Sequence, residues 1–409
     1  MHDWISLLLR ILWGVLSLLV LHYPLFALIG LFAKKRFPKT ERRGRYAIVI
    51  GARNEERVIA RLLQSIWAGD YPNELLTVYV VAHNCNDRTA SIARANGATV
   101  FAYTNPAERT VGYAYRYLFD RLQGELAADR FDGVFIINAD NTVSPDYISR
   151  MNDAFWAYDG KAIVTSFRNA SNFGDNWLSC LYGIFFLAAC RYESRGRAAL
   201  GCSTRVSGTG YVMPASLLNS GWPYVTLTED WELTADQIAR GTRIAYCDEA
   251  EFFDEQPTTA PIMFRQRMRW AKGHMIVFFR AFPKVLGSVF SSQRSARQRF
   301  ASFDAAVSLL PLGVIGLGLT LLSFCLGGGT AVQNWLIGLG TSYLLTVVSA
   351  WLLLMVERAR IRSVPLLLQL VASLLWPFFV ALSIFLDAAA LFVRRVEWHA
   401  IPHGTGTSN

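Results

Sequence analysis

The stretch Tyr46-Ala47-Ile48-Val49-Ile50-Gly51 is a short apolar run that ends at a glycine. A run of this length and composition is typical of a buried strand. Helical periodicity follows over residues 54–68. The same alternation is repeated by apolar runs at 75–82, 99–101 and 133–138 and by helical segments at 89–96 and 112–127. Strands that alternate with helices over about 100 residues predict an α/β domain with a parallel sheet.

Polar residues gather directly after three of these strands. They are Asn54 and Glu55 after the first strand, Asn84 and Asp87 after the second, and Asp140 after the fourth. Ligands of open α/β sheets bind at the carboxyl ends of parallel strands, so these five side chains predict a nucleotide site. Helix N-capping would explain Asn54 or Asp87 singly, but it is a weaker explanation of all three clusters together.

A second pattern lies further along the chain, where the elements are less regular. Glu229 and Asp230 open a predicted helix and supply a carboxylate that could act as a general base. Downstream, Gln266, Arg269 and Trp270 are three and four positions apart and share one face of a helix. Arginine makes forked hydrogen bonds to phosphate, and tryptophan offers a flat apolar surface to a sugar ring. The alternative is an amphipathic helix with a basic edge.

Composition predicts a membrane part beside the α/β domain. The chain has 409 residues, and 53% of them are hydrophobic. Apolar residues concentrate at 4–33, which predicts one transmembrane helix, because a span needs about 20 residues. Further candidate spans lie at 303–326, 333–356 and 364–393. The net charge is +9, and basic residues border the apolar runs, which favours contact with membrane lipids and gives no sign of a nucleic-acid partner.

The basic cluster Lys34-Lys35-Arg36 places the middle of the chain on the cytoplasmic side. A signal peptide is the alternative for the first run, but the run's length and the cluster behind it disfavour this. The six cysteines form no Cys-x-x-Cys pair, so neither a zinc site nor a disulfide framework is expected.

Residues 274–290 predict a helix lying in the membrane interface. Three further crossings would place Arg394-Arg395 on the far side, so either one segment does not cross or the charge rule fails there.

At these residues the chain resembles the membrane-embedded, inverting family-two glycosyltransferases, which include cellulose, hyaluronan and chitin synthases and bacterial exopolysaccharide or capsule synthases. The resemblance runs from about residue 47 to residue 280 and rests mainly on Glu229-Asp230 and on the Gln-x-x-Arg-Trp segment. It implies a nucleotide-sugar-binding α/β domain of the GT-A type and an α-helical transmembrane region. The expected parts are a transmembrane helix at 1–38, a cytoplasmic glycosyltransferase domain at 39–260, the Gln-x-x-Arg-Trp and interfacial helices at 261–300, transmembrane helices at 301–396, and a tail at 397–409.

The resemblance also assigns roles to individual residues. It implies that Asp230 is the catalytic base and that Asp140 holds Mg²⁺ or Mn²⁺. Gln266 and Arg269 would bind the donor's diphosphate, while Trp270 and Glu229 would face the acceptor. Donor binding would further involve Asn54, Glu55, Asn84, Asp87 and Asp140. Arg267 is expected to add positive charge at the same phosphate oxygens.

The chain departs from the family pattern at His83 and Asn138, where the family has acids. These departures leave a transport or scaffold protein with a degenerate nucleotide domain as one alternative. Asp387, within an apolar run, either lines a polymer path or lies at the interface.

The function implied is inverting transfer from a nucleotide-diphosphate sugar, expected to be a UDP-sugar, to a growing β-linked polysaccharide, with the transmembrane helices as its export path. Transfer of a single sugar to a lipid acceptor is the alternative. The expected partners are the sugar donor, a polysaccharide or glycolipid acceptor and membrane lipids. The expected location is a bacterial inner or plasma membrane, with the catalytic domain in the cytoplasm.

Overall fold

The computed structural model describes residues 2–394 and 396, except 128–129, 327 and 362–363. Within this part, eight strands form one sheet in the order β3-β2-β1-β4-β7-β6-β8-β5. The strands are β1 (Tyr46–Ala52), β2 (Leu76–His83), β3 (Thr99–Tyr103), β4 (Gly133–Ile136), β5 (Thr142–Val143), β6 (Ile163–Ala170), β7 (Tyr211–Pro214) and β8 (Ile244–Asp254).

The first half of the sheet is parallel, as the sequence predicts. β1 lies between β2 and β4, with Tyr46 in register with Leu76 on one side and with Gly133 on the other. The second half is mixed, because β7 runs antiparallel to both β4 and β6. β6 was not expected from the sequence, and it pairs in parallel with β8 along its whole length.

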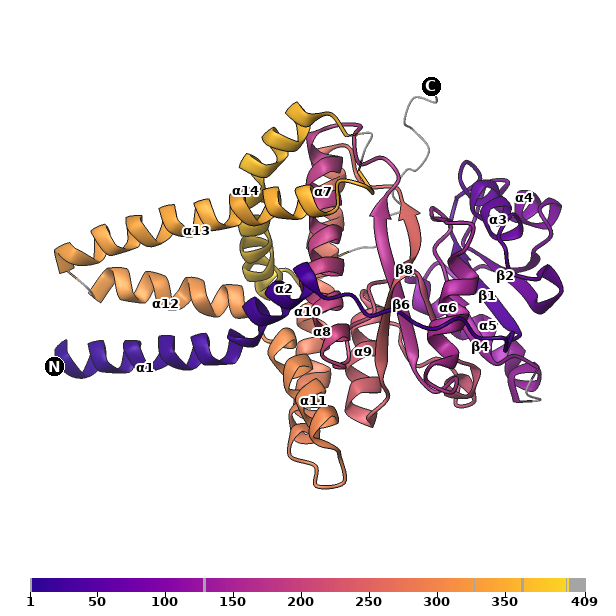
Figure 1. Ribbon diagram of the computed structural model, residues 1–409, viewed down its shortest axis with the longest axis horizontal. Coiled ribbons are helices and arrows are strands. Elements are labelled where there is room, and N and C mark those ends of the chain that lie inside the picture. The colour runs from indigo at the N-terminus through magenta and orange to yellow at the C-terminus, as the bar shows by residue number, and fades with distance from the viewer. Residues whose placement is uncertain (1, 128–129, 327, 362–363, 395, 397–409) are drawn as a thin grey trace.

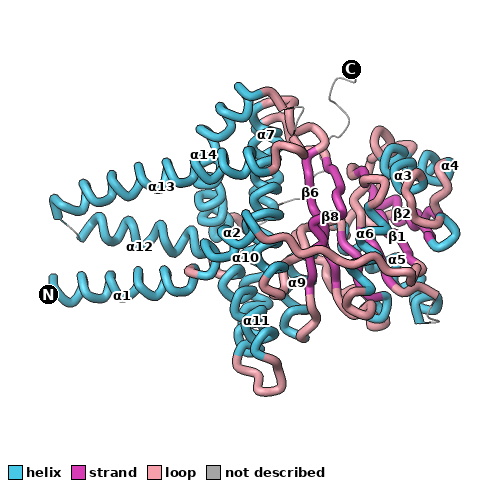
Figure 2. Tube along the Cα trace, in the orientation of Figure 1, coloured by secondary structure: helices cyan, strands magenta, loops and turns pink. Residues whose placement is uncertain are grey.

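Helices cover both faces of the sheet (Figures 1 and 2). Alternate residues of β1 serve the two faces, since Ala47 and Val49 belong to one buried cluster and Ile48 and Ile50 to the other. The first cluster includes residues of α5 (Val111–Ala127) and α9 (Glu229–Arg240). The second includes residues of α3 (Ile59–Trp67) and α6 (Tyr147–Trp156), and α4 (Thr89–Ala95) packs nearby. Helices therefore cover both faces of the sheet, and the edge at the carboxyl ends of the strands remains open to a ligand.

The remaining helices form an apolar part on one side of the sheet. They are α1 (His2–Val20), α2 (His22–Phe32), α7 (Trp177–Ala188), a π-helix (Ala189–Arg195), α8 (Gly196–Ala199), α10 (Ala260–Val289), α11 (Ala296–Leu309), α12 (Leu312–Leu326), α13 (Gly328–Val356) and α14 (Leu366–Phe392). In Figure 1, α1, α12 and α13 project together away from the sheet, while α7, α10 and α14 lie between them and the sheet.

Three helical stretches of the described chain are long and apolar enough to cross a membrane: Trp4–Phe32, Val332–Val356 and Leu366–Phe392. A fourth would be the pair α11 and α12, which is bent by 57°. The expected interfacial helix at 274–290 is not a separate element. It is the second half of α10, which continues through Pro283.

Candidate active site

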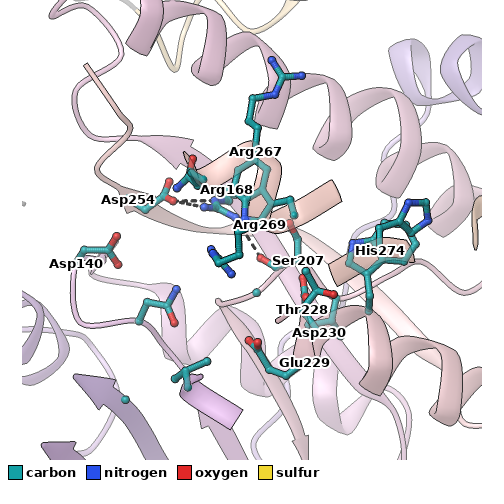
Figure 3. Close-up of a pocket in the computed structure, with 18 of the residues that line it drawn as sticks. Asp140, Arg168, Ser207, Thr228, Glu229, Asp230, Asp254, Arg267, Arg269 and His274 are labelled. Atoms are coloured by element: carbon teal, nitrogen blue, oxygen red, sulfur yellow. Dashed lines mark hydrogen bonds and ion pairs between the residues drawn. The ribbon is translucent and has the colours of Figure 1, made fainter. Parts of the chain in front are cut away.

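A cavity of about 410 Å³ opens at the carboxyl ends of β1 and β4 (Figure 3). The loops after these strands form one wall, with Glu55 and Asp140. The start of α9 and the middle of α10 form the second wall. Residues of α7 and α14 close the third side, so the sheet and the apolar helices share one cavity.

Glu229 and Asp230 line the cavity from the first turn of α9. Burial raises the pKa of both carboxyl groups above the usual range, and the positive charge of Arg269 opposes this. Gly208, which has a φ of +75°, passes beside Asp230, and a Cβ built on it would lie 3.9 Å from Asp230 Oδ2. A glycine at this position leaves the carboxylate accessible from the cavity.

α10 brings the Gln-x-x-Arg-Trp segment against these acids. Arg269 Nη1 donates a hydrogen bond of 2.9 Å to the Leu227 carbonyl, just before α9, and Figure 3 shows its side chain in the cavity between Asp140 and Asp230. The helices approach closely because α10 has Gly273 there, and a Cβ on this glycine would lie 2.4 Å from Thr228 Cγ2. The structure thus brings the carboxylate pair and the guanidinium to one cavity.

Gln266 and Trp270 also line this cavity. Trp270 stacks beside Phe185 of α7, with ring centroids 6.3 Å apart and 18° between the ring planes. Gln266 Oε1 is buried and has no hydrogen-bond partner within the described part of the chain. A ligand with a hydrogen-bond donor would satisfy this oxygen.

Arg267 does not join Arg269. Its side chain extends away from Asp140 and Glu229 (Figure 3), its Nη2 donates to Ser383 Oγ on α14, and its Cζ lies 4.0 Å from the centroid of the Phe379 ring. The contacts of Arg267 with α14 therefore lend no support to the expectation that it reinforces the charge at the phosphate oxygens. Successive helical residues point in directions about 100° apart, so Arg267 and Arg269 cannot serve one face.

Asp140 lies at the opposite wall and accepts a hydrogen bond of 3.0 Å from Asn141 Nδ2. Acidic side chains surround it. Burial, and then the charge of Asp140, raises the pKa of Glu55 to about 9. Asp254 and Glu255 line the same part of the cavity. This excess of carboxylates suits a divalent cation with oxygen ligands.

The acids alone do not complete a metal site. Among the described residues, no three His, Cys, Asp or Glu side chains are grouped closely enough to hold an ion. Mg²⁺ and Mn²⁺ are often bound by one or two carboxylates together with substrate phosphates. The residues at Asp140 fit such an ion when a diphosphate supplies the other ligands.

Several cavity residues were not anticipated from the sequence. They are Arg109, Arg168, Arg205 and Asp254. Arg168 of β6 donates from Nε to Asp254 Oδ2 over 2.9 Å and from Nη1 to the Ser207 carbonyl over 3.2 Å. Isolated arginines carry no sequence signal, and β6 itself was not predicted. His83 and Asn138, which replace the acids of the resembled family, both line the cavity.

Asn54, Asn84 and Asp87, assigned to donor binding from the sequence, are not among the residues that line the cavity. Asn54 Oδ1 accepts from the Asn86 backbone N–H over 2.9 Å. Asn84 Nδ2 donates to the Asn105 carbonyl over 3.0 Å, and Asp87 accepts from the Thr89 backbone at the start of α4. Only Asp87 thus acts as the capping alternative supposes, whereas Asn54 and Asn84 hold neighbouring loops together. Asn54 and Asn84 have φ values of 60° and 52°, a conformation that asparagine tolerates better than most residues.

The family described as "Glycosyltransferase like family 2" matches residues 43–273, which is more than half of the 409 residues. The chain is 27% identical over 242 residues to the "Probable glycosyltransferase YdaM" of Bacillus subtilis, covering 56% of this chain and 55% of that protein. It is 26% identical over 231 residues to a "Beta-monoglucosyldiacylglycerol synthase" of Synechocystis, covering 55% and 47%. The chain thus spans about half the length of these curated relatives.

Among solved structures, the chain is similar to the mannosyltransferase PcManGT from Pyrobaculum calidifontis in complex with GDP-Man and Mn²⁺. The TM-score is 0.58 at 16% identity, and the match covers 93% of this chain and 99% of that one. A likeness at this identity concerns the fold alone, and it confirms the expected GT-A-type fold. The residues matched by the family include the sheet, the acids of α9 and the arginine of α10. The chain therefore belongs to glycosyltransferase family 2, whose enzymes transfer a sugar from a nucleotide sugar.

Proposed function

We propose that this protein transfers a single sugar, with inversion, from a nucleotide-diphosphate sugar to a lipid acceptor at a membrane surface. One observation carries the proposal. The cavity that holds Glu229, Asp230 and Arg269 is also lined by Ser383, Leu386 and Asp387 of α14, a helix apolar enough to lie in a membrane. A lipid head entering along α14 would therefore reach the carboxylate pair without leaving the membrane surface.

Inversion needs a base that removes the proton of the attacking hydroxyl as the new bond forms. We assign this role to Asp230, because it opens α9 beside the space left by Gly208. Glu229, its neighbour in the chain, would contact the acceptor. Arg269 would stabilise the negative charge that develops on the departing diphosphate, since fixed cations in a water-poor site act strongly. Gln266 would hold the same leaving group by a hydrogen bond.

The acidic wall would hold the cation. Asp140 would be its protein ligand, and the neighbouring acids Glu55 and Glu255 would favour positive charge there. A bound Mg²⁺ or Mn²⁺ would supply Lewis acidity at the diphosphate oxygens. The Pyrobaculum mannosyltransferase was solved with Mn²⁺ and GDP-Man, which supports a divalent ion and a nucleotide-sugar donor for this chain.

Extension of a β-linked polysaccharide is the second candidate. It is favoured by Trp270, whose ring lies beside Phe185 at the cavity and would stack a sugar acceptor. Relatives include an N-acetylglucosaminyltransferase of Rhizobium meliloti, 26% identical over 255 residues. The lipid acceptor is favoured by the share of the cavity that α14 forms and by the name of the Synechocystis relative. An integral location in a bacterial inner membrane, with the catalytic domain cytoplasmic, is part of the proposal.

Product analysis tests the function directly. Detergent-purified protein is incubated with Mn²⁺, labelled UDP-sugars and mixed membrane lipids, and nucleotide release, organic-phase label and product size are measured. We expect label in the organic phase with one sugar per lipid. Label in long water-soluble polymer would favour the second candidate. Nucleotide release that never exceeds that of boiled enzyme would contradict both and support the degenerate-domain alternative.

A further inference from the structure

The membrane side of the cavity holds three polar side chains that sugar activation does not use. They are Arg267 of α10 and Ser383 and Asp387 of α14. Ser383 and Asp387 are four residues apart, so they share one face of their helix. Polar and charged residues are costly within an apolar helix of this kind and usually serve a function there. These three side chains are therefore candidates for contact with the acceptor.

Arg267 is held in place but incompletely bonded. Its side chain is only 5% exposed, Nη2 donates to Ser383 Oγ, and the Phe379 ring lies against the guanidinium. Nη1 is buried and has no hydrogen-bond partner within the described residues. Leaving such a donor unpaired costs free energy, which a ligand oxygen would recover.

Asp387 supplies the complementary group. Its charge acts on Arg267, and both side chains line the cavity, where Arg267 Nη1 is without a hydrogen-bond partner among the described residues. A carboxylate accepts hydrogen bonds, and a guanidinium only donates them. A hydroxyl group does both, so a diol or sugar would satisfy Arg267 and Asp387 together.

The charges at this end of the cavity disfavour an anionic acceptor. Arg205 is paired with Glu193 and Arg168 with Asp254. Burial lowers the pKa of His274 to about 4, so its ring is neutral near pH 7. The negative charges of Glu229 and Asp230 act on Arg269. The cations here thus have nearby carboxylates, and no excess positive charge is left to neutralise a lipid phosphate.

We infer that Arg267, Ser383 and Asp387 form the acceptor subsite and that this subsite takes an uncharged lipid head that carries hydroxyl groups, such as glycerol or a sugar. The inference rests on the proposed transfer to a lipid. In this arrangement Arg267 and Asp387 orient the head, and the hydroxyl to be glycosylated faces Asp230. Their role is positioning, so they should affect acceptor use more than donor cleavage.

The test compares two lipids as acceptors for the full-length protein in detergent micelles: diacylglycerol and a polyprenyl phosphate. The variants are Asp387→Asn, Arg267→Lys and Ser383→Ala. Matched controls are Arg265→Gln, an exposed arginine of the same helix, and Ser373→Ala, a serine of α14 that bonds the Gln369 carbonyl instead. Acceptor KM, donor KM and acceptor-independent nucleotide release are measured for each.

We expect the parent to prefer diacylglycerol. Asp387→Asn and Arg267→Lys should raise its acceptor KM about tenfold or more, with donor KM and nucleotide release within about twofold of the parent, and both controls should resemble the parent. Asp387→Asn should also reduce the preference for diacylglycerol over the polyprenyl phosphate. Transfer mainly to the polyprenyl phosphate by the parent would overturn the inference while the proposed lipid transfer stands. Variants whose acceptor KM matches that of the controls would overturn it too. Polymer without any labelled lipid would instead refute the proposed function itself.

Discussion

The role proposed for Asp230 as the catalytic base can be tested at the residue scale. Asp230→Asn keeps the size of the side chain but cannot accept the proton, so turnover should fall at least about 100-fold. Donor binding should stay near that of the parent, and the melting temperature should not fall, because the substitution removes a buried charge beside Glu229. Initial rates, nucleotide titration and thermal unfolding measure these effects. Substantial retained turnover would rule out the assignment.

The matched control lies on the same helix. Asp236→Asn changes an acid of α9 that is paired with Lys284 and with Arg240 over 2.8 Å, outside the cavity. It should lower the melting temperature and leave turnover unchanged. Asp230→Asn should thus lower turnover without lowering the melting temperature, whereas Asp236→Asn should lower the melting temperature without lowering turnover.

The pH dependence of the reaction follows from the same burial. A base must be deprotonated to work, and burial raises the pKa of Asp230. Activity should therefore be lost as the pH falls through a value above the usual aspartate range, and it should be full well above that value. The kcat/KM profile of the parent measures this acidic limb. A profile that stays flat down to pH 4 would contradict a buried base.

At the element scale, the close approach of α9 and α10 brings the base and Arg269 together. Gly273→Ala would place a methyl group within 2.4 Å of Thr228 Cγ2, and relief of such overpacking costs about 1–3 kcal/mol. We expect a lower melting temperature and a lower kcat, because the two helices must separate at the site. Thermal unfolding and steady-state kinetics check both effects.

Gly287→Ala is the control on the same helix, since nothing lies within 4 Å of a Cβ built there. Alanine favours helix over glycine by about 1 kcal/mol, so this variant should be equally active and slightly more stable. Equal behaviour of the two alanine variants would show that the approach of α9 and α10 does not matter.

How far the sequence predicts the structure also differs by element. β1, β2 and β4 follow from short apolar runs, because a strand buried on both faces leaves that pattern. The cavity's arginines do not follow, since Arg168 meets Asp254 only through the pairing of β6 with β8. The strand-end polar clusters mislead in part. Glu55 and Asp140 line the cavity, whereas Asn54, Asn84 and Asp87 fasten loops, and both uses place polar residues at the same positions of the sequence.

The arrangement of the whole molecule bears on whether the last helix crosses the membrane and so places the basic residues Arg394-Arg395 on the far side, against the charge rule. α11 packs at the sheet side, because Ala301 and Ala305 belong to the buried cluster that also contains Ala47 and Val49 of β1. The chain after α13 is tied there too, because Arg360 Nη2 donates to the Asp248 carbonyl of β8 over 2.8 Å. α12 and α13 therefore lead away from the sheet and return to it, beside α1 (Figure 1).

α14 starts at this same side and also ends there. Its last turn is bound by Lys272 of α10, whose Nζ donates to the Ala390 carbonyl over 3.0 Å. Val364, just before α14, belongs to a buried cluster with Phe167 of β6 and Tyr246 of β8. Both ends of α14 thus lie at the catalytic part, and in Figure 1 the helix runs across α13. We therefore predict that α14 lies along the membrane without crossing it, so that the C-terminus and the catalytic domain share one side and the basic residues there obey the charge rule.

A C-terminal tag in sealed inside-out vesicles tests this prediction, with protease digestion of the tag as the measurement. We expect the tag to be cleaved in intact vesicles, together with the catalytic domain, because both face outward there. A tag on the N-terminus should be protected until detergent is added, which controls for leaky vesicles. Protection of the C-terminal tag would mean that α14 crosses the membrane. If α14 crossed, Asp387 would lie within the bilayer. The acceptor would then reach the cavity between helices and not along the membrane surface.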